Sequence, residues 1–292
     1  TLLLVGQTNV AVGQHKTAES ALRELLELVP DNAQYQYFHG VALANSGDRA
    51  ASRAAFERCL ALDTDYAAAR AALGRLSLSE GDIDAAIEVA GKLQQSFPND
   101  AQGFLLQADA LLSAKQLEDA EAAYHLAQAR RPERTTIMKI SAVQRALGTP
   151  DRAISTFADW LVERPDDQVV RVALASLHQS NGNNEEASKL YEQAIVAEPT
   201  NGIALNNLAW IYHERSDARA LSIAKQAYEL LPERAEIIDT YAWFLIESGR
   251  AEQGLQLLDR ALAAAPDNAD IRYHRAAGLA CAGDKPQARS EL

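Results

Sequence analysis

The chain has 292 residues, of which 48% are hydrophobic and 6% aromatic, a composition typical of a folded protein with a sizeable buried core. Its 40 acidic and 28 basic side chains give a formal net charge of -12, which argues against nucleic acid as a partner because phosphate contacts need clustered lysine and arginine. Cys59 and Cys281 are too few for a disulfide framework, and no apolar run approaches the roughly 18 residues of a transmembrane segment.

A proline recurs at intervals of 33 or 34 residues, with one double interval in which Thr64 stands where the proline is missing. The prolines are Pro30, Pro98, Pro132, Pro165, Pro199, Pro232 and Pro266. Three further columns keep the same phase. The first column of small residues is Gly6, Gly40, Gly74, Ala108, Ala142, Ala175, Ala209, Ala242 and Ala276, and the second is Ala18, Ser52, Ala86, Ala120, Ala153, Ala187, Ala220, Gly254 and Ala288. Between them lies a column of turn glycines, Gly13, Gly47, Gly81, Gly148, Gly182, Gly249 and Gly283. A constant period of this length indicates a repeat architecture.

Each period contains two amphipathic stretches of helical spacing, separated by the glycine column and followed by the proline. Glycine ends a helix in the left-handed conformation without steric penalty, and proline disfavours helical geometry in the residue before it. Each period is therefore predicted to be a helical hairpin, and the chain an all-α array. In chain order the hairpins are 1–32 (partial), 33–66, 67–100, 101–134, 135–167, 168–201, 202–234, 235–268 and 269–292 (partial).

Two features depart from the regular pattern. Lys115 and Arg215–Ser216 stand where the turn glycine is missing, and the segments 142–153 and 209–220 are each one residue short. We expect the two shortened hairpins to bend differently from the others.

These columns resemble the tetratricopeptide repeat, whose pattern combines a small residue and an aromatic in the first helix with a small residue, an aromatic and a final proline in the second. The period 33–66 contributes His39-Gly40, Leu43, Ser52 and Phe56, and the period 202–234 contributes Leu205, Leu208-Ala209, Tyr212, Ala220, Ala224 and Pro232. The resemblance implies a right-handed superhelical solenoid of stacked antiparallel helix pairs. We expect a single solenoid over 1–292, truncated at both ends because neither end has the polar capping helix that solenoids need.

No catalytic, cofactor or metal motif is present in the sequence. None of the six histidines lies in HExxH, no Cys/His cluster has zinc spacing, and no glycine-rich phosphate loop appears. His39 and His178 fall in interior columns of the predicted hairpins, and Trp160 in a second-helix interior column, so all three are predicted to pack in the core. The sequence therefore indicates a protein that is not an enzyme, with no cofactor and no metal.

In tetratricopeptide arrays the first helix of each repeat lines the concave side, so the resemblance places a partner-binding groove there. In the last three repeats the groove positions bring amides, carboxylates and aromatics together. They are Asn206, Asn207, Trp210 and His213, then Asp239, Thr240, Trp243 and Glu247, then Tyr273 and His274. Such a wall suits an extended peptide or a sugar, because aromatic faces supply area and amides pair with a backbone or hydroxyl. The alternative is that these residues pack between repeats, with the tryptophans half buried.

The last 90 residues also resemble bacterial envelope tetratricopeptide lipoproteins of PEP-CTERM/exosortase systems, which are encoded with exopolysaccharide machinery. This narrower resemblance rests on Asn206–Trp210, Asp239–Trp243, Ile271–His274 and Ala282–Lys285. It implies a scaffold in the bacterial periplasm or envelope, with the cytoplasm as the alternative location. The leading prediction is a protein–protein interaction scaffold in exopolysaccharide export or protein sorting. The alternatives are a substrate-docking or regulatory arm of a larger enzyme such as a glycosyltransferase, and direct polysaccharide binding.

Overall fold

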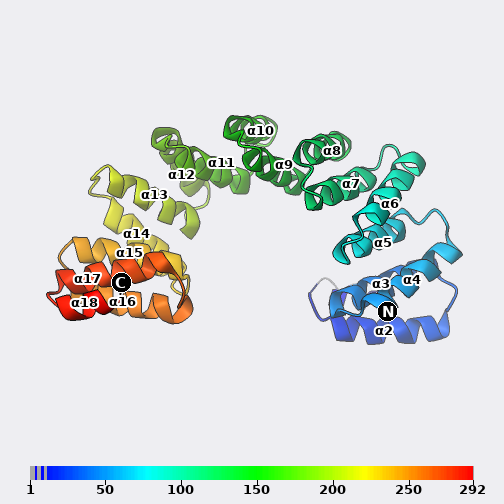
Figure 1. The fold of residues 1–292 in the computed structure, drawn as a ribbon, viewed down its shortest axis with the longest axis horizontal. Coiled ribbons are helices and arrows are strands. Elements are labelled where there is room, and N and C mark those ends of the chain that lie inside the picture. The colour runs from blue at the N-terminus through cyan, green and yellow to red at the C-terminus, as the bar shows by residue number, and fades with distance from the viewer. Residues whose placement is uncertain (1–3, 5–7, 10–11, 292) are drawn as a thin grey trace. The chain divides into compact units, whose positions relative to one another are not determined.

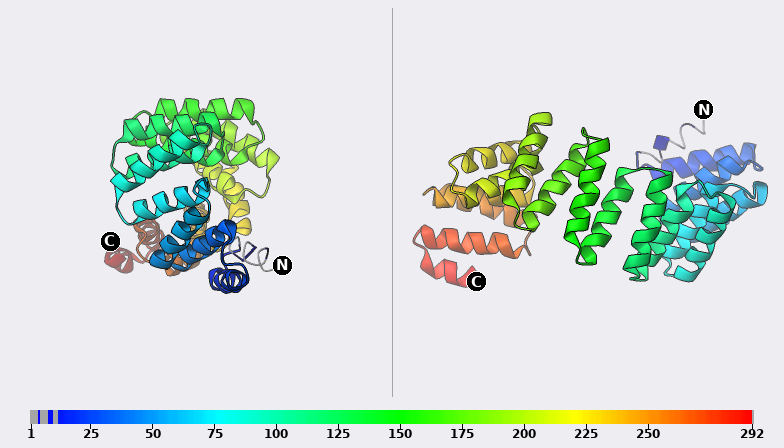
Figure 2. Two further views of the ribbon diagram at one scale, coloured as in Figure 1. Left: turned by 90° about the vertical axis from the view of Figure 1, so that its right-hand side faces the viewer. Right: turned by 90° about the horizontal axis from the view of Figure 1, so that it is seen from above.

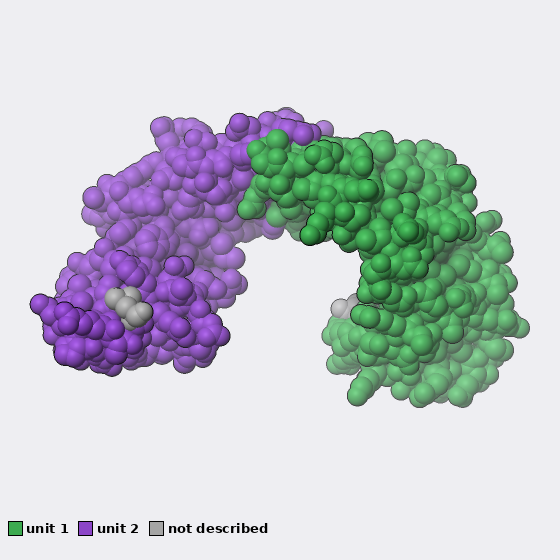
Figure 3. All heavy atoms as spheres, viewed as in Figure 1, with its two compact units in different colours: residues 1–149 green, residues 150–292 purple. Residues whose placement is uncertain are grey.

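A computed structural model of the protein describes residues 4, 8–9 and 12–291. The chain divides into two compact units, residues 1–149 (unit 1) and residues 150–292 (unit 2), which Figure 3 shows in green and purple. The boundary falls inside the predicted hairpin 135–167. Much of the first helix expected in the partial repeat 1–32, with the column residue Gly6, lies outside the described residues.

The regular elements of the described residues are helices, and within each unit every helix contacts the next one along the chain. Unit 1 contains α2 (His15–Leu28), α3 (Ala33–Ser46), α4 (Arg49–Leu62), α5 (Ala67–Ser79), α6 (Ile83–Ser96), α7 (Ala101–Ser113), α8 (Leu117–Arg130) and α9 (Arg134–Ala146). Unit 2 contains α10 (Pro150–Glu163), α11 (Gln168–Ser180), α12 (Asn184–Ala197), α13 (Gly202–Glu214), α14 (Ala220–Leu230), α15 (Ala235–Glu247), α16 (Ala251–Ala264), α17 (Ala269–Cys281) and α18 (Lys285–Glu291). Consecutive helices lie side by side within each unit (Figures 1 and 2), which confirms the predicted all-α array of stacked helix pairs.

The turn of each hairpin is left-handed at the third column. The seven turn glycines have φ between +72° and +92°. Where the column lacks glycine, Lys115 (φ 61°) and Ser216 (φ 55°) adopt the same conformation. The turn position is therefore a property of the hairpin, and glycine is the residue that occupies it with least strain.

The two small-residue columns let the helices of a hairpin approach closely. In the hairpin α3–α4, a Cβ atom on Gly40 would lie 2.6 Å from the Phe56 ring, and the Ser52 hydroxyl donates to the Gly40 carbonyl at 2.9 Å. In the later hairpins Ala175, Ala187 and Ala209 are completely buried. The larger side chains pack around these contacts, as in the cluster that Tyr191, Leu208 and Ile211 form in unit 2.

One of the two shortened hairpins differs in its second helix. Helix α14 has 11 residues, whereas α12 and α16 each have 14. The longer turn before α14 is closed by Arg219, whose guanidinium donates to the Asp217 carboxylate at 2.7 Å and lowers the pKa of Asp217 to about 2.

Of the three residues predicted to pack in the core, only Trp160 is buried. Trp160 is 6% exposed, and its Nε1 donates to Asp167 Oδ2 at 3.0 Å. His39 and His178 are half-buried. No helix in the described part of the chain has the length and apolar character needed to cross a bilayer.

Candidate functional site

The first helices of the hairpins in unit 2 each carry one face of similarly spaced residues. Residues three, four or seven positions apart share a face of an α-helix, so each set below forms a stripe along its helix. We define the A-helix stripe as Val169, Val172, Ala173, Ser176 and Gln179 of α11; Ile203, Asn206, Asn207, Trp210 and His213 of α13; Glu236, Asp239, Thr240, Trp243 and Glu247 of α15; and Asp270, Tyr273, His274 and Ala277 of α17. All the site residues predicted from the sequence lie on it.

The stripe residues of α13 and α15 are joined by a tryptophan. Trp210 Nε1 donates to Thr240 Oγ1 at 2.9 Å, and the Thr240 hydroxyl donates to the Glu236 carbonyl of its own helix at 2.9 Å. Thr240 is only 2% exposed, and the half-buried Trp210 ring meets the Phe244 ring edge-on at 5.1 Å between centroids. Trp210 is thus fixed between two repeats.

The stripe residues of α15 and α17 are joined by a histidine. His274 Nδ1 lies 2.9 Å from both carboxylate oxygens of Asp239, and because a carboxylate is an acceptor, Nδ1–H is the donor. The imidazole also stacks on the Trp243 ring, with centroids 4.6 Å apart and an interplanar angle of 20°. The side chains of His274 and Asp239 are 13% and 10% exposed, so the pair is largely enclosed by its neighbours.

A second histidine–carboxylate pair joins α13 and α15. His213 Nε2 contacts the Glu247 carboxylate, and the His213 ring stacks on Phe244 at 4.4 Å with an angle of 11° between planes. Both residues are more exposed than the His274 pair, with side-chain exposures of 30% and 40%.

The two asparagines form the α13 end of a hydrogen-bond chain. Asn206 Nδ2 donates to Asn207 Oδ1 at 3.4 Å, Asn207 Nδ2 donates to the Tyr191 hydroxyl at 3.0 Å, and that hydroxyl donates to Gln179 Oε1 at 3.1 Å. Burial raises the pKa of Tyr191, so the phenol stays protonated and serves as the donor. Asn206 Oδ1 is buried without a hydrogen-bond partner among the described residues.

The structure therefore brings most of the predicted residues of α13, α15 and α17 into contact around Trp210 and His274, whereas Asn206 and Asn207 connect to Tyr191 and Gln179 instead. Both tryptophans are half-buried, as the packing alternative expects. Tyr273 differs, because it is 58% exposed.

Four exposed members of the stripe were missed by the sequence analysis. Val169 is 52% exposed and Ile203 is 45% exposed, the Glu236 side chain is 65% exposed, and Asp270 is also exposed. They stand at the start of the stripe on α11, α13, α15 and α17, three residues before Val172, Asn206, Asp239 and Tyr273. That spacing is the signal that could have found them, since it places each residue on the same face one helical turn earlier.

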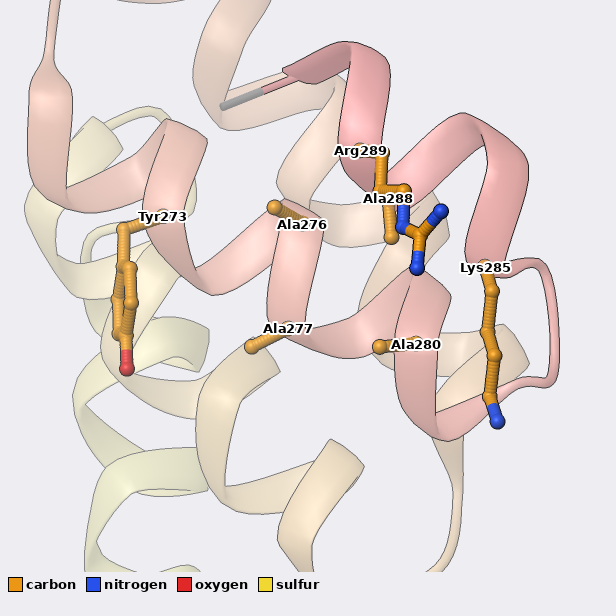
Figure 4. A pocket seen from close by; sticks show the side chains of 7 residues that line it. All are labelled: Tyr273, Ala276, Ala277, Ala280, Lys285, Ala288 and Arg289. Atoms are coloured by element: carbon orange, nitrogen blue, oxygen red, sulfur yellow. The ribbon is translucent and has the colours of Figure 1, made fainter.

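A pocket of about 330 Å³ adjoins the stripe between α17 and α18 (Figure 4). It is lined by Tyr273, Ala276, Ala277, Ala280, Lys285, Ala288 and Arg289, of which Tyr273 and Ala277 belong to the stripe. In Figure 4 Tyr273 stands on one side of the alanines and Lys285 on the other. Within the described residues, no group of three or more His, Cys, Asp and Glu side chains is placed to hold a metal ion.

Comparison with known proteins identifies the repeat. Family models described as tetratricopeptide repeat match residues 6–67, 43–110, 171–202, 190–220 and 218–279, which together span 6–110 and 171–279. A TPR repeat-containing protein of Pseudomonas aeruginosa is 25% identical over 170 residues, which cover 56% of this chain and 28% of that protein. The match thus spans little more than a quarter of the curated relative.

Two solved structures share the fold. A tetratricopeptide repeat protein from Parabacteroides merdae has a TM-score of 0.56 at 14% identity, covering 85% of this chain and 98% of its own. A chain of the APC/C hetero-tetramer Cut9-Hcn1 has a TM-score of 0.56 at 16% identity, covering 95% of this chain and 54% of its own. The names of these three proteins do not refer to exopolysaccharide or PEP-CTERM systems, so that narrower resemblance stays a prediction. Because repeat models match more than half of the residues and the hairpins carry the expected columns, the chain belongs to the tetratricopeptide repeat family.

Proposed function

We propose that the protein is a non-catalytic scaffold, and that the A-helix stripe of unit 2 holds an extended segment of a partner protein. The observation that carries this proposal is the exposure of three large apolar side chains, Val169, Ile203 and Tyr273, on a surface whose tryptophans, histidines and asparagines are fixed by contacts with their neighbours. Val169, Ile203 and Tyr273 offer apolar area to a partner, and the fixed neighbours reduce the entropy lost on binding.

The family supports a binding role of this kind. Helical repeats build extended surfaces from successive elements, and such surfaces suit elongated ligands. One solved neighbour, the Cut9-Hcn1 chain, belongs to a hetero-tetramer. Because the match covers only 28% of the Pseudomonas relative, a docking arm of a larger enzyme stays an alternative for the whole protein. A place in envelope exopolysaccharide export or protein sorting stays a finer prediction.

Direct polysaccharide binding is less favoured by the geometry. A sugar ring needs a free aromatic face, whereas Trp210 has ring contacts with His213, Phe244 and His274, and Trp243 is stacked on His274. The two tryptophan rings therefore contribute to packing between the stripe helices, and their faces are not free to stack on a sugar.

The test is affinity capture of protein partners from cells that encode the protein, with the 292-residue chain as bait. Ile203→Asn with Tyr273→Asn removes two exposed apolar groups of the stripe and should abolish capture of a specific partner. The matched control is Val162→Asn with Val196→Asn, which removes apolar groups that are 82% and 83% exposed on the second helices α10 and α12. Capture that survives the stripe variant, or is lost equally in the control, would refute the proposal.

A further inference from the structure

We propose that the segment held by the A-helix stripe carries two apolar residues, which lie over α11 and α13, and two lysine or arginine residues, which lie over α15 and α17. This inference rests on the proposed function, because it names the chemistry of the segment that the scaffold holds.

The first residue of the stripe is apolar in two successive repeats and acidic in the next two. Val169 of α11 and Ile203 of α13 are apolar, and Glu236 of α15 and Asp270 of α17 are acidic. All four are exposed and occupy equivalent places in successive repeats, at spacings of 34, 33 and 34 residues. A ligand that crosses the four helices therefore meets two apolar contacts and then two carboxylates.

The two carboxylates are available to a cationic partner. Asp270 forms no ion pair with a described residue, and Glu236 has one 3.8 Å contact with Arg234, in which both side chains are more than half exposed. An exposed contact at that distance contributes little. The two histidines nearby are engaged with Asp239 and Glu247.

No residue of the stripe is a lysine or arginine, so the stripe itself supplies no such cation to neutralise Glu236 and Asp270. Complementary charge then favours a basic ligand and disfavours an acidic one, since like charges at an interface are repelled. The apolar contacts at α11 and α13 add affinity without selecting for charge.

The spacing of the helices sets the spacing of residues in the ligand. The stripe helices are alternate helices of the array, of which α13 contacts α15 and α15 contacts α17. Helices in direct contact lie about 8–10 Å apart, and an extended chain advances about 3.3–3.6 Å per residue, so roughly three residues separate contacts on these helices and at least three separate contacts on α11 and α13. Four contacts fit a segment of about ten residues, with apolar side chains at positions 1 and 4 and basic side chains at positions 7 and 10.

The experiment measures binding of ten-residue peptides, amidated at the C-terminus and carrying an uncharged BODIPY label, to the 292-residue chain by fluorescence anisotropy. One peptide has leucine at positions 1 and 4 and arginine at positions 7 and 10, with serine and glutamine elsewhere. Two others replace arginine by glutamine or by glutamate, and a fourth replaces leucine by serine. Each is made in both sequence directions, because the stripe does not fix the polarity of the ligand. The dissociation constant of the arginine peptide should be lower than that of the glutamate peptide by a factor of about ten or more.

The matched variants separate local charge from net charge. Glu236→Gln with Asp270→Asn should weaken binding of the arginine peptide by about threefold to tenfold and leave the glutamine peptide unchanged. Asp159→Asn with Glu252→Gln makes the same change in net charge on exposed positions of the second helices α10 and α16, and should leave both affinities within about twofold.

Equal affinities for the arginine, glutamine and glutamate peptides would overturn the inference, as would equal effects of the two double variants. If the leucine-containing peptides still bind and Ile203→Asn weakens them, the proposed function stands without the charge selectivity. Failure of every peptide to bind overturns the inference, and unchanged partner capture by the stripe variant separately overturns the proposed function.

Discussion

Thr240 connects two repeats through one hydroxyl group, which accepts from Trp210 and donates to the Glu236 carbonyl. Replacement by valine keeps the shape and removes both bonds, leaving the indole N–H without its acceptor in a half-buried place. We expect Thr240→Val to lower the free energy of unfolding by about 1–3 kcal/mol, measured as a shift of the urea midpoint at unchanged slope. Thr200→Val in an exposed loop is the control, with an expected change within about 0.5 kcal/mol. Equal midpoints would show that the hydrogen bond contributes nothing.

His39 gives unit 1 a dependence on pH. Burial lowers the pKa of His39 below its ordinary value of 6.5, with a smaller raising effect from Glu19. The unfolded chain then binds a proton more readily than the folded chain, so this contribution to stability is present above pH 6.5 and is lost as the pH falls through the folded pKa. We expect the unfolding midpoint to drop less between pH 7.5 and pH 5 in His39→Leu than in the wild type. Between pH 7.5 and 8.5 the unfolding midpoints of the variant and the wild type should change equally. Equal changes below pH 6.5 as well would show that His39 does not cause the pH dependence.

At the scale of elements, glycine has opposite roles in two helices. A Cβ on Gly254 of α16 would lie 2.4 Å from Ile246 Cγ1 and 2.7 Å from the Ala242 carbonyl oxygen of α15, and a backbone oxygen has little room to move. Gly91 of α6 has nothing within 4 Å of that position. Gly254→Ala should therefore destabilise by about 1–3 kcal/mol, whereas Gly91→Ala should stabilise by about 0.5–1 kcal/mol through helix propensity. Circular dichroism melts of the two variants check this, and a shift in the same direction would show that the close approach at Gly254 is unimportant.

The helical hairpins could be predicted from the sequence because each column meets a local need of the backbone. Small residues allow the helices to approach, glycine adopts the left-handed turn, and proline follows the end of the second helix. The exceptions Lys115 and Ser216 were visible as missing glycines, but their left-handed conformation was not. The hairpin imposes it through hydrogen bonds that occur at the glycine turns too. Asp48 N donates to Leu43 O at 3.0 Å beside Gly47, and Gln116 N donates to Leu111 O at 2.9 Å beside Lys115.

The residues of the candidate site could be predicted from the sequence, but the contacts between their side chains could not. Helical periodicity places Trp210, Asp239 and His274 on equivalent faces, but the Asp239–His274 pair joins residues 35 apart, and only tertiary packing decides which side chains meet. The solvent exposure of each side chain could not be predicted either, because aromatic residues on the same helix face are half-buried at Trp243 and exposed at Tyr273. The apolar and acidic residues at the start of the stripe could not be inferred from the repeat columns, because they lie one helical turn before the groove positions that the family resemblance implies.

At the scale of the whole molecule, the net charge of -12 creates a field that acts before any contact forms. A cationic ligand should associate faster at low ionic strength, because the screening length falls from roughly 20 Å at 25 mM salt to about 4 Å at 500 mM. We expect the association rate constant of the arginine peptide to fall by about tenfold or more over this range, with a smaller change in its dissociation rate, as measured by stopped-flow fluorescence.

The same measurement on variants separates the field from the local contacts. Glu236→Gln with Asp270→Asn changes the net charge only from -12 to -10, since two acidic groups are removed, so most of the salt dependence of association should persist. Its loss of affinity should instead appear as faster dissociation, because the removed carboxylates act after the peptide has docked. A salt dependence that disappears in this double variant would place the whole electrostatic effect in Glu236 and Asp270. If the association rate constant of the wild type does not change with salt concentration, the net negative charge of the chain does not accelerate binding of a basic partner.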